Sequence, residues 1–289
     1  MKVLPGPQPF NITSLPDEDT INLANEQTVT EFGDLINLSP ETDELKPEEI
    51  AEAFEHALVR FQADGWRVEI DPKLGKQSIT VRQGSKRVLV PAEHNVKKNV
   101  VDGLIIHEIG THVLRRLNGE RTKLKLLGLG LDRVGPGEEG IGVTREQAIK
   151  KEVRDFRGLA GHFAISLAVG LDGQPRNFRA VYEILNKLYK FNNVFEGQDQ
   201  TIAEQEAREE AWRRCVRTFR GSDCKTPGIC SHRDIYYREG NIAVWNLIRN
   251  NPEEMFRFSI GKYNPANSRH LWVLKELGIT DQDLNLLEH

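Results

Sequence analysis

The chain has 289 residues, of which 38% are hydrophobic and 28% charged, and its formal net charge is −4. This composition is typical of a globular protein with a large buried core, and it argues against a strongly basic nucleic-acid binder or a polybasic membrane surface. No apolar run approaches the ~20 residues that a membrane-spanning helix requires. We therefore expect neither nucleic acid nor a membrane among its partners.

The first 40 residues are rich in proline, asparagine, aspartate and threonine and lack clear periodicity. We expect residues 1–40 to form an extended arm or an irregular cap, followed by one domain over residues 41–286. Residues 287–289, Leu-Glu-His, are set aside as a possible vector remnant.

Three cysteines, Cys215, Cys224 and Cys230, lie close together in the sequence. Their odd number and the lack of an apolar signal segment at the N-terminus predict a cytoplasmic protein without a disulfide framework. Their spacings are not those of a zinc knuckle, although a structural zinc site that uses cysteines stays open as an alternative.

The hydrophobic periodicity predicts an α+β fold that is mostly helical. Proline and acidic residues mark the start of a helix from about residue 47 to residue 62. Three alternating segments, 66–70, 78–81 and 87–90, predict a small antiparallel sheet joined by glycine-containing hairpin turns. The remaining predicted helices are 95–118, 144–170, 175–193, 202–220, 240–250 and 267–277.

The predicted helix that ends near Gly119 carries His107, Glu108 and His112 in an otherwise apolar stretch. Burying these three side chains costs several kcal/mol each unless they are paired or coordinated. A bound metal ion is the simplest compensation, although two unrelated histidines on a core helix would give the same pattern.

The two histidines are five residues apart, whereas the familiar zinc-peptidase motif HExxH places them four apart on one face. Five residues of an ideal α-helix rotate by ~500°, which leaves the second imidazole ~140° off the face of the first. A π-bulge, with its i→i+5 hydrogen bond, would realign them, and such bulges favour functional sites. The spacing therefore predicts a helix distortion near Gly110 and Thr111.

A third ligand is needed, because catalytic zinc has three protein ligands and one open position. The glycine-rich stretch 135–143 offers Glu138 and Glu139 as candidates. These acids could equally mark the solvated start of a helix.

Further motifs follow the histidines. They are Arg115 with Asn118-Gly119, the run from Leu126 to Arg133, Glu138-Glu139-Gly140, Arg217-Thr-Phe-Arg220-Gly221, Asp234-Ile-Tyr-Tyr237-Arg-Glu-Gly240 and Gly261-Lys262. Together with His-Glu-Ile-Gly-Thr-His, they resemble the microtubule-associated tyrosine carboxypeptidase family and its bacterial relatives, in order over roughly residues 50–265. The resemblance implies a zincin-like metallopeptidase domain with the small sheet beside the metal-binding helix.

The resemblance also implies roles for individual residues. His107, His112 and Glu139 would bind one Zn²⁺ per chain, and Glu108 would be the catalytic base. Glu139 is preferred to Glu138 because it directly precedes the glycine. The chain departs from the family pattern after Glu139, where Gly-Ile-Gly-Val replaces an expected leucine-alanine pair, and at His232-Arg233, where threonine-lysine is expected. These departures leave the metal site intact but affect the expected substrate preference.

The expected reaction is hydrolysis of a peptide bond by zinc-bound water, with Glu108 taking the proton and Tyr237 stabilising the oxyanion. A carboxypeptidase also needs a cation for the terminal carboxylate of its peptide or protein substrate. Arg217 and Arg220, one helical turn apart, and Arg233 are the candidates, with Tyr237. For the first two arginines, surface salt bridges are an equal alternative.

The expected activity is therefore removal of a C-terminal residue, with aromatic residues first to be tried. Alternatives are a zinc endopeptidase or aminopeptidase, or a non-catalytic zinc-binding module that keeps the fold. Glu108 speaks against a purely structural zinc site, which needs no general base.

Overall fold

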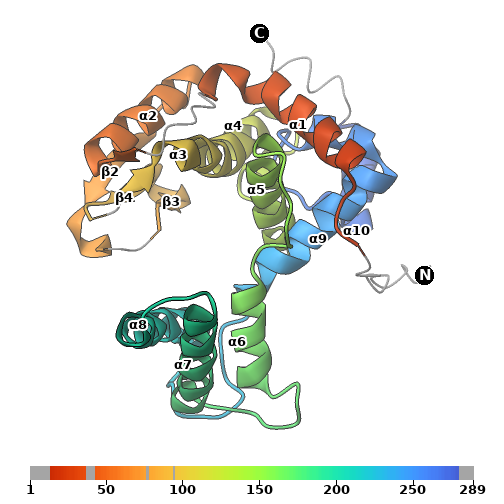
Figure 1. Ribbon diagram of the computed structural model, residues 1–289. Coiled ribbons are helices and arrows are strands. Elements are labelled where there is room, and N and C mark those ends of the chain that lie inside the picture. The colour runs from red at the N-terminus through yellow and green to blue at the C-terminus, as the bar shows by residue number, and fades with distance from the viewer. Residues whose placement is uncertain (1–13, 37–42, 76–77, 94, 280–289) are drawn as a thin grey trace, which may run out of the picture. The chain divides into compact units, whose positions relative to one another are not determined.

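The computed structural model describes residues 14–36, 43–75, 78–93 and 95–279 (Figure 1). The possible vector remnant at 287–289 and residues 1–13 of the predicted arm lie outside the described residues. The chain divides into two compact units: the first runs up to Asp155 and resumes at Gly240, and the second comprises Phe156–Glu239. Both units are mainly helical, with short strands in the first, which agrees with the predicted mostly helical α+β class.

The first unit contains most of the elements. Its helices are α1 (Glu18–Phe32), α2 (Pro47–Arg60), α3 (Lys98–Ile105), the π-helix η4 (Ile106–Val113), α4 (Leu114–Arg121), α5 (Gly135–Ile149), α10 (Ser268–Glu276) and, from Gly240 on, α9 (Ile235–Asn250). Short 3₁₀ turns are η1 (Gly33–Leu35), η2 (Pro72–Leu74), η3 (Gln83–Ser85), η5 (Lys125–Gly128) and η6 (Pro252–Arg257).

Residues 18–32 are helical, although an extended or irregular arm was expected there. The side chain of Asp17 caps the helix by accepting a hydrogen bond from the Thr20 N–H at 2.9 Å. Ala24, Thr28 and Phe32, spaced four apart, form a buried stripe. The sequence does not show this helical period clearly, because two of the three buried side chains, Ala24 and Thr28, are small or polar.

The main sheet has the strand order β2 (Arg67–Asp71), β4 (Arg87–Pro91), β3 (Thr80–Arg82). The three strands lie where they were predicted, but the expectation of a purely antiparallel sheet was wrong: β2 pairs with β4 in parallel, and only β3 and β4 are antiparallel. The reason is burial. Four of the five residues of β4 are buried, so β4 takes the central position and separates the other two strands. A second ladder joins β1 (Glu44–Leu45) to β5 (Val96–Lys97).

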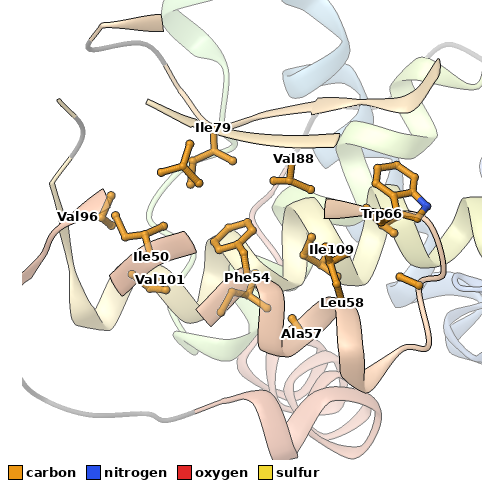
Figure 2. Close-up of a cluster of buried hydrophobic side chains, with 14 of the residues drawn as sticks. Ile50, Phe54, Ala57, Leu58, Trp66, Ile79, Val88, Val96, Val101 and Ile109 are labelled. Atoms are coloured by element: carbon orange, nitrogen blue, oxygen red, sulfur yellow. The ribbon is translucent and has the colours of Figure 1, made fainter. Parts of the chain in front are cut away.

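The consecutive elements α3, η4 and α4 form one helical run over residues 98–121, here called the central helix. Figure 1 shows α2 and the main sheet beside α3. In Figure 2, Ile109 of the central helix points into the same buried cluster as Phe54 of α2 and Val88 of β4. This apolar packing fixes one face of the central helix. The side chains on its other faces, including His107 and His112, do not belong to this cluster.

Helix α5 begins at Gly135 and ends at Ile149, so the glycine-rich stretch 135–143 is helical. The predicted helix 144–170 was therefore wrong, since it joined the end of α5 to α6 across a break. The glycines of α5 permit close packing: a Cβ at Gly140 would lie 2.4 Å from the backbone of Gly240 in α9, and a Cβ at Gly240 would lie 1.9 Å from the Pro136 carbonyl oxygen. Two glycines thus let α5 and α9 touch through their backbones.

The second unit is built from α6 (Leu159–Val169), α7 (Phe178–Phe195) and α8 (Gln200–Phe219), together with the first turn of α9. Its core includes Ala164, Leu185, Ala211 and Phe219. None of the described helices in either unit combines the length and the apolarity needed to cross a bilayer.

We expect Phe54→Ala to destabilise the first unit by about 3–5 kcal/mol, because Phe54 is fully buried in the cluster of Figure 2 and its removal leaves a cavity. Urea unfolding followed by circular dichroism measures the loss. The matched control is Val59→Ala on the same helix, where the side chain is 74% exposed and little change is expected. Equal effects of the two substitutions would contradict this description of the core.

Candidate metal centre

The helix that carries both histidines is a π-helix between two α-helical segments. Over Ile106–Val113 its hydrogen bonds span five residues, and the Leu114 N–H accordingly donates to Ile109. The predicted distortion between His107 and His112 is therefore confirmed. Its effect is to place the two imidazoles together, with ring centroids 5.0 Å apart.

Helix α5 brings a carboxylate to the two rings. Glu139 Oε2 lies 3.5 Å from His107 Nε2 and 3.8 Å from His112 Nε2. Two ligand atoms of a tetrahedral zinc ion, each bound at 2.0–2.1 Å, are roughly 3.4 Å apart. The two distances to Glu139 are therefore close to this value. Among the described residues, His107, His112 and Glu139 form the group that could hold a metal ion, with their ligand atoms within 4.8 Å of one another.

One carboxylate oxygen of this trio lacks a hydrogen-bond partner in the part of the chain that the structure describes. Among the described residues, Glu139 Oε2 is buried and makes no hydrogen bond. A buried carboxylate oxygen without a partner is costly, and a cation bound between it and the two imidazoles would remove that cost. The residues present thus fit a metal such as zinc, which favours imidazole and carboxylate ligands.

Each imidazole is oriented by a second carboxylate. His107 Nδ1 donates to Glu146 of α5, and His112 Nδ1 donates to Glu138 Oε1 at 3.0 Å. A proton on Nδ1 leaves the lone pair on Nε2, which is the atom that faces Glu139. In both rings Nε2 is therefore the nitrogen that a metal ion would bind.

Glu138 is buried, and its oxygens are used by other groups. It accepts hydrogen bonds from Arg115 Nη1 and, at 2.7 Å, from Lys262 Nζ, in addition to that from His112. Burial alone would raise its pKa, but the charges of Arg115 and Lys262 outweigh burial and hold the pKa well below its usual range. The solvated helix start considered from the sequence is wrong for both acids, because Glu139 is also largely buried.

The pKa of Glu139 is lowered to about 2: burial opposes ionisation, and the interaction with His107 and the charge of His112 outweigh it. Glu108 follows His107 in the π-helix. Burial raises its pKa, against the opposing charges of His107 and His112. The three residues His107, His112 and Glu139 are here called the donor trio, because their atoms could bind a metal. The site therefore combines the ionised carboxylate of Glu139 in this trio with the more basic carboxyl group of Glu108 next to it.

Residues 14–284 match the sequence profile of the family described as microtubule-associated tyrosine carboxypeptidase. The chain belongs to this family. It is also similar to microtubule-associated tyrosine carboxypeptidase 1 from rat, mouse and human, with 24% identity over 182 residues in each case. The matched region covers 61% of this chain and 34% of each relative, so the chain spans about a third of the length of these curated relatives.

Two residues of the candidate metal site were not found from the sequence. A Cβ at Gly142 would lie 2.9 Å from three atoms of the His107 ring, so only glycine leaves room for this imidazole. Glu146 holds the same ring from its Nδ1 side. The signal was helical spacing: Glu139, Gly142 and Glu146 recur three and four residues apart on one face of α5.

The arginines predicted to bind substrate belong to the second unit, whereas the donor trio belongs to the first. Arg217 donates to Asp234 from Nε at 2.8 Å and from Nη2 at 3.1 Å, and Arg220 Nη2 donates to Asp234 at 3.0 Å. The Arg217 guanidinium also lies over the Tyr237 ring, at 6.0 Å. Arg214 Nη1 also donates to Asp234 at 3.4 Å, so this nearly fully buried carboxylate binds three guanidinium groups.

Arg233 is exposed. The substrate-binding roles of Arg217, Arg220, Arg233 and Tyr237 stay predictions. The cysteines are free thiols, and none of them joins the His-His-Glu group in the part of the chain that the structure describes.

We expect Gly142→Ala to weaken Zn²⁺ binding by roughly tenfold or more, because the new methyl group displaces the His107 ring from its position. Competition with a chromophoric chelator measures the affinity, and circular dichroism verifies folding. The control is Gly84→Ala, since a Cβ at Gly84 has no neighbour within 4 Å. Unchanged affinity in a folded Gly142→Ala variant would contradict the placement of His107 against α5.

Proposed function

We propose that the chain is a zinc-dependent metallopeptidase of the carboxypeptidase type, with His107, His112 and Glu139 as ligands of one Zn²⁺ and Glu108 as catalytic base. The observation that carries the proposal is the convergence of one ligand atom each from His107, His112 and Glu139 within 4.8 Å of one another, beside the half-buried carboxyl group of Glu108. A zincin-like architecture is part of this proposal.

The chemistry divides between the metal and the protein. When bound, Zn²⁺ would polarise the scissile carbonyl and make a water molecule acidic near neutral pH. Glu108 accepts one proton from the attacking water and delivers it to the amine nitrogen as the carbon–nitrogen bond breaks. The products are a carboxylate and a free amine, and Glu108 returns to its starting form. Glu138 and Glu146 keep the two imidazoles in place throughout.

Membership of a carboxypeptidase family favours removal of a C-terminal residue from a peptide or protein, with aromatic residues as the first candidates. The relatives' names refer to tyrosine and to microtubules. For this chain, which spans about a third of their length, we propose a preference for an aromatic C-terminal residue and no action on microtubules. Recognition of the terminal carboxylate is assigned to Arg217, Arg220 and Arg233. Tyr237 is the proposed oxyanion partner.

We expect Glu108→Gln to lower turnover by roughly 10²–10⁴-fold while zinc binding and the fold are kept, because the change removes a base and leaves the ligand trio unchanged. Mass spectrometry of a peptide library incubated with the zinc-loaded protein measures turnover. Glu52→Gln, an exposed position of α2, is the matched control and should retain full activity. Full activity in Glu108→Gln would refute the mechanism. Zinc binding without cleavage of any peptide by the unaltered protein would favour a non-catalytic module.

The exopeptidase part of the proposal has its own test. We expect peptides with a free C-terminal carboxylate and an aromatic last residue to lose that single residue, and the same peptides with a C-terminal amide to be resistant, because the amide has no charge for a guanidinium group to bind. Cleavage of both forms at internal bonds would identify an endopeptidase, and loss of N-terminal residues would identify an aminopeptidase.

A further inference from the structure

The carbonyl oxygen of Gly110 lies where the central helix changes its hydrogen-bond pattern. The N–H of Leu114 donates to the carbonyls of Ile109 and Thr111. In an α-helix the same N–H would bond to Gly110, four residues earlier. Because the helix returns to the i→i+4 pattern in α4, the Gly110 carbonyl needs a donor from outside the helix.

Arg145 of α5 is that donor. Its side chain is buried, and Nη1 donates to the Gly110 carbonyl at 3.1 Å and to Thr111 Oγ1 at 3.3 Å. The Thr111 hydroxyl in turn donates to the Ile106 carbonyl, five residues earlier, at 3.1 Å. One guanidinium nitrogen therefore contacts Gly110 and Thr111, two of the four residues between the two histidines.

The Arg145 guanidinium is itself held in place by groups far away in the sequence. Nη2 donates to Glu31 Oε2 at 2.7 Å and to Ser259 Oγ at 2.8 Å, and the Ser259 hydroxyl donates to Glu31. The guanidinium lies over the Phe32 ring, 4.8 Å from its centroid. A buried positive charge needs such partners, and these three partners fix the orientation of the guanidinium group.

Phe32, the last residue of α1, also touches the π-helix directly. A Cβ at Gly110 would lie 2.9 Å from Phe32 Cε1, so glycine at this position lets the ring pack on the backbone. Phe32 is fully buried. The contact gives a structural reason for the glycine within the His-Glu-Ile-Gly-Thr-His motif.

We propose that Arg145 is a positioning residue of the metal centre, which keeps η4 in the π-helical form that aligns His107 with His112. The inference rests on the proposed metal site. If η4 relaxed to an α-helix, the Gly110 carbonyl would be taken by the helix itself, and Arg145 would lose its acceptor. Five residues of that α-helix would rotate by ~500°, so the second imidazole would lie ~140° off the face of the first.

Helix α1 holds the Arg145 guanidinium in place through Glu31 and Phe32. This helix therefore supports the metal centre through Arg145, although none of its residues belongs to the donor trio. Ser259, from the last part of the first unit, completes the same support.

Two variants and a control test the proposal in the full chain. Arg145→Met keeps the apolar stem and removes the donors, Arg145→Lys keeps one charged donor, and Arg154→Met changes an arginine that is 84% exposed. Two quantities are measured: the Zn²⁺ dissociation constant by chelator competition, and hydrogen exchange of the amides of residues 106–114 in the metal-free protein, with the amides of α2 as internal reference.

We expect Arg145→Met to weaken Zn²⁺ binding by roughly 10–100-fold and to accelerate exchange in η4 while α2 is unchanged. Arg145→Lys should restore part of both losses, and Arg154→Met should behave as the unaltered protein. A folded Arg145→Met variant with unaltered affinity and unaltered η4 exchange would overturn the proposal, as would equal loosening of α2 and η4.

If Arg145→Met does not fold, Glu31→Gln replaces it, because this change keeps the arginine and removes only its charged partner. Faster exchange confined to η4 would then support the proposal, and unaltered exchange would overturn it. Failure of the unaltered protein to bind Zn²⁺ would refute the proposed function instead. Exchange in the metal-free protein would still decide the role of Arg145.

Discussion

Two histidines five residues apart on one helix can face a common point only if the helix is widened between them. This single constraint organises the first unit. The π-helix brings the His107 and His112 rings to a centroid distance of 5.0 Å. The opposite face of the same helix is fixed by Ile109 in the apolar cluster with Phe54, so the distortion is held between a core on one side and a polar site on the other (Figure 2).

Helix α5 contributes the carboxylates of the site, and they contact different nitrogens of the two imidazoles. Glu139 faces both Nε2 atoms, while Glu138 and Glu146 each hold one Nδ1 atom. The negative charge gathered there is balanced by Arg115 and Lys262, both of which donate to the same carboxylate. A divalent cation at the trio would complete this balance.

The sequence was most informative where spacing alone determines geometry. The five-residue interval between the histidines predicted the π-helix, and alternation predicted the strands, but the pairing of β2 with β4 depends on which strand is most buried in the final fold. The glycines of α5 could not be explained from the sequence, because they contact distant groups: Gly140 packs on the α9 backbone and Gly142 on an imidazole. Partners such as Lys262 of Glu138, 124 residues apart in sequence, follow from no local pattern.

The proposed metal centre holds one zinc ion between two imidazole nitrogens and one carboxylate oxygen. The most direct measurement is an anomalous difference map from crystals of the zinc-loaded protein, with data collected on both sides of the zinc absorption edge. We expect one peak per chain, about 2.0–2.2 Å from Nε2 of His107, Nε2 of His112 and a carboxylate oxygen of Glu139. A peak at other residues, or no peak between these three when the crystals contain zinc, would contradict the proposed metal centre.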